Sequence, residues 1–155
     1  MIEISERVEV PAPPRIVWDV LSDPRAVVDC VPGAQLGDQL EDGSYDATVT
    51  VKFGPAKITF HAKVALELDN IAMIGRVSSR ARDDQGGARV KTAMTFKVVE
   101  GEVPGSSAVP INAQVEISGR LASLVESGAA VVVKRMTGEF TERLAARCAK
   151  ATGQG

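Results

Sequence analysis

The fold is decided by residues 120–150, RLASLVESGAAVVVKRMTGEFTERLAARCAK, set against the strand-like middle of the chain. Apolar residues recur in this segment at steps of three and four, a spacing that predicts one long helix with an apolar stripe. The stripe consists of Leu121, Leu124, Val125, Gly128, Val132, Met136, Phe140, Leu144 and Cys148. Such a helix needs an apolar surface to cover, and the rest of the chain must supply it.

The middle of the chain alternates apolar and polar side chains, which is typical of antiparallel strands with one buried face. Ile58 and Phe60, for example, share one face of their strand, and His61 belongs to the other. Asp42-Gly43 predicts a two-residue hairpin turn. We expect strands over residues 2–10, 35–41, 44–53, 57–68, 71–82, 89–99 and 109–118. The first of these is apolar on one face except at Glu6.

Two short helices are predicted after the first strand. Pro14 suits the first turn of one helix. A second helix begins at Pro24, with Ser22 or Asp23 as its cap, and Pro32-Gly33 ends it.

Together these elements predict one α+β domain over residues 1–151 and a short flexible tail at residues 152–155. We expect a curved antiparallel sheet of about seven strands around the long C-terminal helix. Small residues are frequent on the facing surfaces of the sheet and the helix, so packing between them is incomplete. The sequence therefore predicts an internal cavity.

Composition limits the classes of function. The chain has 155 residues, of which 45% are hydrophobic and 25% are charged, as is ordinary for one soluble domain. Its net charge of −2 gives no general attraction for nucleic acid. The sequence has no apolar run long enough to cross a bilayer, and its N-terminus lacks a signal-peptide pattern. We therefore expect a cytoplasmic protein.

No catalytic or metal-binding set is predicted. His61, the single histidine, falls on an outward strand face, and one histidine excludes a multi-histidine metal site. Cys30 and Cys148 are predicted to be small packed residues, because neither is placed to lower the pKa of its thiol. Asp23 and Asp29 are better explained as capping groups than as a catalytic pair.

Each large apolar side chain has two interpretations, as part of a packed core or as part of a cavity wall. Methionine and aromatic side chains are typical of ligand pockets, and as a group they favour a binding cavity. The predicted wall consists of Trp18, Phe53, Phe60, Met73, Met94, Phe96, Val115, Ile117, Leu124, Val132, Met136 and Phe140. In an enzyme of cyclase or hydrolase type, which is an open alternative, the polar groups of the cavity would be Tyr45, Ser79 and Thr92.

Basic residues repeat on two neighbouring predicted strands. Arg76, Arg80 and Arg82 fall on the outward face of one strand, and Arg89 and Lys91 belong to the next. One interpretation is an ordinary solvated face, neutralised by nearby acidic residues. The other is a docking surface for an acidic partner or for lipid headgroups.

Several segments resemble one protein family closely. They are Pro11-Ala12-Pro13, Val17-Trp18, Leu21-Ser22-Asp23-Pro24, Cys30-Val31-Pro32-Gly33, Asp42-Gly43-Ser44-Tyr45, Val51-Lys52-Phe53-Gly54-Pro55 and Ile117-Ser118-Gly119-Arg120-Leu121-Ala122. With these segments the sequence resembles the CoxG family, the CoxG subunit of carbon monoxide dehydrogenase, within the START-like, helix-grip (SRPBCC) superfamily. The resemblance extends over nearly the whole chain, and it implies the helix-grip fold.

The resemblance further implies a non-enzymatic accessory protein that binds a hydrophobic ligand, a quinone or a lipid-like molecule, with no covalent cofactor. It implies association with a molybdenum-containing CO dehydrogenase or a related hydroxylase, and peripheral contact with the inner face of the membrane. Family members proposed to reach the membrane carry a C-terminal extension, and we expect no anchor of that kind between the long helix and Gly155. A docking or maturation subunit with no functional cavity is a further alternative.

Overall fold

The computed structural model describes residues 1–85 and 87–151. Gly86 and the predicted tail at residues 152–155 lie outside the described residues. The strands are β1 (Ile2–Val10), β2 (Ala34–Gln39), β3 (Tyr45–Phe53), β4 (Ala56–Asp69), β5 (Ile74–Asp83), β6 (Arg89–Lys97), β7 (Val99–Glu100) and β8 (Ser107–Ser118). The helices are α1 (Pro14–Leu21), α2 (Pro24–Cys30) and α3 (Ala122–Ala151).

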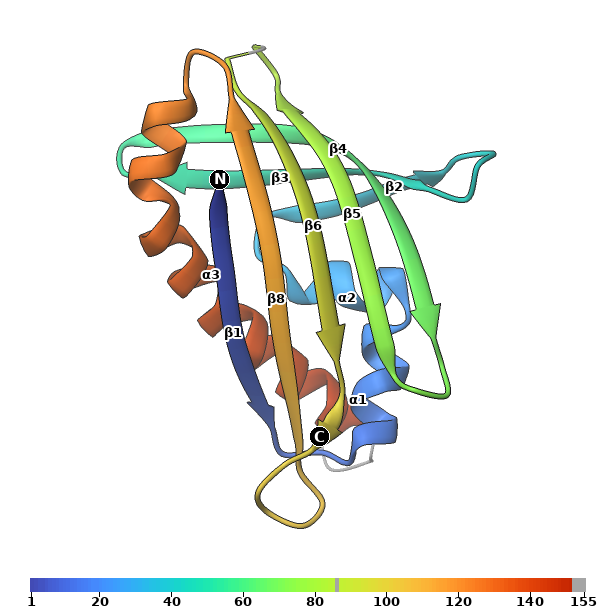
Figure 1. Cartoon of the computed structure of the whole chain (residues 1–155). Helices are drawn as coiled ribbons and strands as arrows, with labels where there is room; N and C mark the ends of the chain where they lie inside the picture. The colour runs from blue at the N-terminus through green and yellow to red at the C-terminus, as the bar shows by residue number, and fades with distance from the viewer. Residues whose placement is uncertain (86, 152–155) are drawn as a thin grey trace.

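The strands form one strongly curved antiparallel sheet (Figure 1). Hydrogen-bonded neighbours follow the order β1-β8-β6-β5-β4-β3-β2, and β7 pairs with β8 beside this path. β1 pairs with β8 along its whole length, from Ile2 opposite Val115 to Val10 opposite Ser107. The first strand of the chain therefore forms one edge of the sheet, and β2 forms the other.

All three helices lie on the concave side of the sheet (Figure 1). α3 contacts β1, β3 and β8 as well as α1 and α2, so it crosses the hollow side of the sheet. The predicted helix-grip arrangement is confirmed, with the two-residue β7 as one strand more than the sequence indicated. None of the described helices is both long and apolar enough to cross a membrane.

The connection between β2 and β3 is not the predicted two-residue turn. It runs from Leu40 to Ser44, with a φ of 88° at Gly43. The Asp42 carboxylate accepts hydrogen bonds from the backbone N–H (3.0 Å) and the hydroxyl (2.5 Å) of Ser44. These bonds, together with one from Lys63, hold the pKa of Asp42 well below its usual range. Side-chain bonding therefore stabilises a wider loop than the Asp-Gly pair alone predicts.

The end of α2 depends on glycine. Asp23 caps the start of the helix by accepting a hydrogen bond from the backbone N–H of Arg25 (3.1 Å). After the helix, Gly33 adopts a φ of 78°, and a Cβ at this position would collide with the carbonyl oxygen of Thr50 on β3. Glycine is required here both for the backbone conformation and for the close approach of β3.

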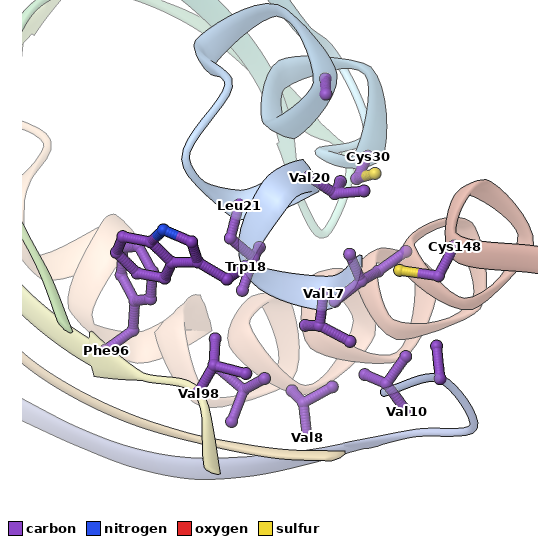
Figure 2. Close-up of a cluster of buried hydrophobic side chains, with 14 residues drawn as sticks. Val8, Val10, Val17, Trp18, Val20, Leu21, Cys30, Phe96, Val98 and Cys148 are labelled. Atoms are coloured by element: carbon purple, nitrogen blue, oxygen red, sulfur yellow. The ribbon is translucent and has the colours of Figure 1, made fainter. Parts of the chain in front are cut away.

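The first of two packed clusters surrounds Trp18 (Figure 2). The indole N–H of Trp18 donates to the side-chain oxygen of Asn70 (2.9 Å), and its ring centroid lies 6.0 Å from that of Phe96. Leu144 and Cys148, near the end of α3, belong to this cluster. The cluster fixes the C-terminal part of α3 against α1 and the sheet.

The second cluster fixes the other end of α3. Val125 and Val132 pack there with Phe53, Ile58 and Phe60 from β3 and β4. The long helix is therefore anchored near both ends, and its middle lies between the two clusters.

Candidate ligand-binding cavity and basic sheet face

The hollow of the sheet contains an apolar cavity of about 390 Å³. Its walls come from the inward faces of the strands, from α2 and from the middle of α3. Val133, Met136, Thr137 and Phe140 are the α3 residues in the wall. They lie between the parts of the helix that fill the two clusters. The volume is within the range of small-molecule sites, roughly 300–1,000 Å³.

Some of the predicted wall residues line this cavity, and others lie elsewhere. Met94, Phe96, Met136 and Phe140 line it. The predicted residues that are not part of its lining are Trp18, Phe53, Phe60, Met73, Val115, Ile117, Leu124 and Val132. That any of these side chains binds a ligand stays a prediction.

Close packing explains most of these differences. Phe53 packs against Gly128 of α3, where the Cβ of any other residue would lie 3.0 Å from the phenyl ring. The notch at Gly128 thus holds this ring in the second cluster and away from the cavity. Trp18 is enclosed in the first cluster, whereas Leu124 lies on the solvent side of α3 with 38% of its surface exposed.

Sequence reasoning missed the wall that α2 and β2 provide. Val27, Val28, Val31, Pro32 and Leu36 line the cavity, and each is only half-buried. The spacing of Val27 and Val31, one helical turn apart, was a signal that could have identified this wall. The Cys-Val-Pro-Gly segment therefore contributes to the cavity as well as ending the helix.

Three polar side chains interrupt the apolar lining: Glu6, Tyr45 and Thr137. Tyr45 was expected inside the cavity, but Ser79 and Thr92 are not part of its lining. Glu6 corresponds to the break in the apolar face of the first strand. It is the one charged residue of this lining.

The other titratable candidates lie outside the cavity. His61 is exposed and forms an ion pair with Asp84. Cys30 and Cys148 are buried free thiols, and burial raises the pKa of both, that of Cys148 to about 11. Buried thiols of this kind are unreactive. Within residues 1–85 and 87–151, no group of three His, Cys, Asp or Glu side chains could hold a metal ion.

The outer face of the sheet carries six exposed basic side chains, which we call the basic array. Its members are His61, Lys63, Arg80, Arg82, Arg89 and Lys91. Lys63, Arg80 and Lys91 stand opposite one another on β4, β5 and β6, and the other three members form the adjacent row. Arg76, predicted together with Arg80 and Arg82, lies outside the array and opposite Glu67.

Few acidic groups neutralise the basic array. Lys63 pairs with Asp42 (3.0 Å) and His61 pairs with Asp84. The other four members form no ion pair within the described residues. Like charges directly opposite one another destabilise a sheet. The array therefore costs folding stability, and its retention calls for another explanation.

Similar folds occur among solved structures. A conserved protein from Geobacillus kaustophilus superimposes with a TM-score of 0.83 at 16% identity, covering 97% of each chain. The Zhui aromatase/cyclase from Streptomyces sp. R1128 gives 0.64 at 13% identity, over 97% of this chain and 95% of that one. A START superfamily protein from Mycobacterium smegmatis gives 0.59 at 18% identity, over 96% and 98%. At these identities the similarity shows the START-like fold alone.

Sequence comparison identifies the family. No protein with a curated description matches this chain. The family profile of the CoxG subunit of carbon monoxide dehydrogenase matches residues 7–149. This range includes α2, the cavity wall formed by α3, and the whole basic array. The chain therefore belongs to the CoxG family of carbon monoxide dehydrogenase subunits.

Proposed function

We propose that this protein is a non-enzymatic accessory that binds a hydrophobic small molecule in its cavity and works beside a molybdenum-containing CO dehydrogenase or a related hydroxylase. The observation that carries the proposal is the apolar cavity between two closely packed clusters. Protein interiors are normally filled to the density of organic crystals. A space confined to the middle of one helix, while both ends are tightly packed, is what a binding site requires.

The proposed ligand is a quinone or a lipid-like molecule. Met94 and Met136 give the wall adaptable side chains, and Phe96 and Phe140 offer aromatic rings. Transfer of apolar ligand surface from water to such a wall is favourable by about 25 cal/mol per Å². Membership of the family supports a quinone and the CO dehydrogenase partner.

The placement of the titratable groups favours binding over catalysis. His61 is on the outer face of the sheet, and both thiols are enclosed in protein. An enzyme of cyclase or hydrolase type is the second candidate, because Glu6 and Tyr45 place a carboxyl and a phenol in the cavity wall. The similarly folded Streptomyces protein is an aromatase/cyclase.

For the partner, we propose that the basic array receives an acidic surface of the molybdenum enzyme. The array is exposed, largely unneutralised and unfavourable for the isolated fold. An acidic partner would remove the repulsion among its members, so association and relief of this cost coincide.

Extraction of the purified protein tests the binding proposal. We expect organic solvent to release a lipophilic molecule, identified by mass spectrometry, and the emptied protein to bind decylubiquinone. Ala47→Phe places a ring in the cavity wall and should abolish binding. Ala65→Phe, on the exposed outer face of β4, is the matched control and should leave it unchanged.

Two results would contradict the proposal. One is the absence of both a co-purified ligand and any quinone binding. The other is equal binding by the Ala47→Phe and Ala65→Phe variants, which would place the bound molecule outside the cavity. Conversion of the released molecule during incubation would instead support the enzymatic alternative.

A further inference from the structure

Glu6 occupies a position that the fold would otherwise fill with an apolar side chain. It lies on the inward face of β1 between Ile4 and Val8, and opposite Ile111 on β8. Ile4 and Ile111 line the cavity together with Glu6. A leucine or valine here would complete the apolar face and contribute burial energy. The carboxylate gives up that contribution.

Nothing in the described part of the protein compensates the carboxylate. Glu6 has no hydrogen bond and no ion pair within residues 1–85 and 87–151. No lysine, arginine or histidine belongs to the cavity lining. A charge beside an apolar wall is unfavourable unless a donor reaches it. A donor supplied by the ligand would meet this need.

We propose that Glu6 determines the specificity of the cavity by accepting a hydrogen bond from a hydroxyl group on an otherwise apolar ligand. This inference rests on the proposed binding function and narrows its ligand class. An ionised carboxylate only accepts hydrogen bonds, and bonds to a charged group are stronger than neutral ones. A ligand whose oxygens only accept would face Glu6 unfavourably. Among quinones, the reduced form carries ring hydroxyls and the oxidised form does not, so the site selects the reduced form.

A matched pair of probes isolates this contact. 4-Octylphenol and its methyl ether, 4-octylanisole, share a ring and an apolar chain and differ in the hydroxyl donor. We expect the protein, freed of bound lipid, to bind the phenol roughly ten-fold more tightly than the ether in isothermal titration calorimetry. The readout is the ratio of the two dissociation constants, because the apolar contribution cancels in it.

Substitutions assign the preference to one side chain. Glu6→Leu should reduce the ratio to about one while leaving binding of the ether intact or stronger. Glu6→Gln, which keeps the shape and an amide acceptor, should retain a smaller preference. Glu3→Gln, on the exposed outer face of the same strand, is the control and should keep the full ratio.

The outcomes separate this inference from the binding proposal. Tight and equal binding of both probes would overturn the role of Glu6 and leave the cavity as a binding site. Failure of both probes and of decylubiquinone to bind would overturn both proposals. A ratio that persists in Glu6→Leu would assign the hydroxyl to another group. Much tighter binding of 4-octylbenzylamine than of the phenol would show that Glu6 selects a cation and would overturn the hydroxyl assignment.

Discussion

Trp18 is almost completely enclosed, with 1% of its surface exposed, and its one polar atom is satisfied from a distant turn. The partner, Asn70, lies in the connection between β4 and β5. The side chain of Arg15 on α1 reaches the backbone carbonyl of the same Asn70 (3.4 Å). At the scale of single residues, Asn70 therefore joins the first helix to a hairpin far along the chain.

Removal of the Asn70 side chain should be costly. Asn70→Ala leaves the indole N–H buried without a partner, and we expect the free energy of unfolding to fall by about 1–3 kcal/mol. Urea unfolding followed by circular dichroism measures this change. Asn112→Ala, on the exposed outer face of β8, is the control and should cost less than about 0.5 kcal/mol. Equal losses in the two variants would show that the indole bond contributes nothing.

Among the elements, α2 has two tasks in a length of seven residues. It lines the cavity through Val27 and Val28, and it contacts α1, α3 and β2. Helices this short are not stable alone, so caps and packing decide whether they form. The Asp23 cap at one end and Gly33 at the other therefore help to build the cavity wall.

Loss of the cap should affect both stability and binding. Asp23→Ala removes the bond to the Arg25 backbone, and we expect it to lower the free energy of unfolding by about 1 kcal/mol. Because α2 is part of the wall, decylubiquinone affinity should fall as well. Asp19→Ala on the exposed side of α1 serves as the comparison. A cap variant with lower stability but unchanged affinity would show that α2 does not shape the site.

For the molecule as a whole, charge is distributed unevenly. The net charge is −2, yet six basic side chains gather on the outer face of the sheet. Repulsion across β4, β5 and β6 opposes folding, and dissolved salt screens it. Stability and partner binding therefore make opposite demands on the same residues.

Charge reversal in the array separates these demands. Arg80→Glu places a carboxylate between Lys63 and Lys91, and we expect it to stabilise the isolated fold by roughly 0.2–1 kcal/mol for each opposed pair. The same change should weaken co-purification with the molybdenum enzyme. Thermal unfolding at low salt and affinity capture measure the two effects.

Arg76→Glu provides a matched control for this reversal. It puts a second acid opposite Glu67, so it should destabilise the fold while leaving association intact. Association that survives Arg80→Glu would remove the basic array from the docking surface.

The sequence was sufficient for the fold because its signals are periodic. Alternation along the strands and the three-and-four spacing of α3 are local properties, and each predicts its element directly. The choice between core and cavity wall is not local. Phe53 and Phe96 both face inward, but the Gly128 notch holds Phe53 in a cluster, whereas Phe96 reaches the cavity.

The basic array shows the same limit. Alternation alone places Lys63 and Arg80 on the outward faces of their strands. Only the register between β4 and β5 sets them opposite each other and puts Arg76 opposite Glu67. Register depends on the turns, and the turn between β2 and β3 was itself predicted wrongly.

The anchoring of α3 at both ends has a consequence for kinetics. A ligand that leaves from beside Met136 needs only the middle of the helix and α2 to move, while the clusters at Val125 and Leu144 stay formed. Such local openings are far less costly than global unfolding. The residence time of the ligand and the lifetime of the native state are therefore set by different barriers. Evolution can change the speed of delivery without changing the durability of the protein.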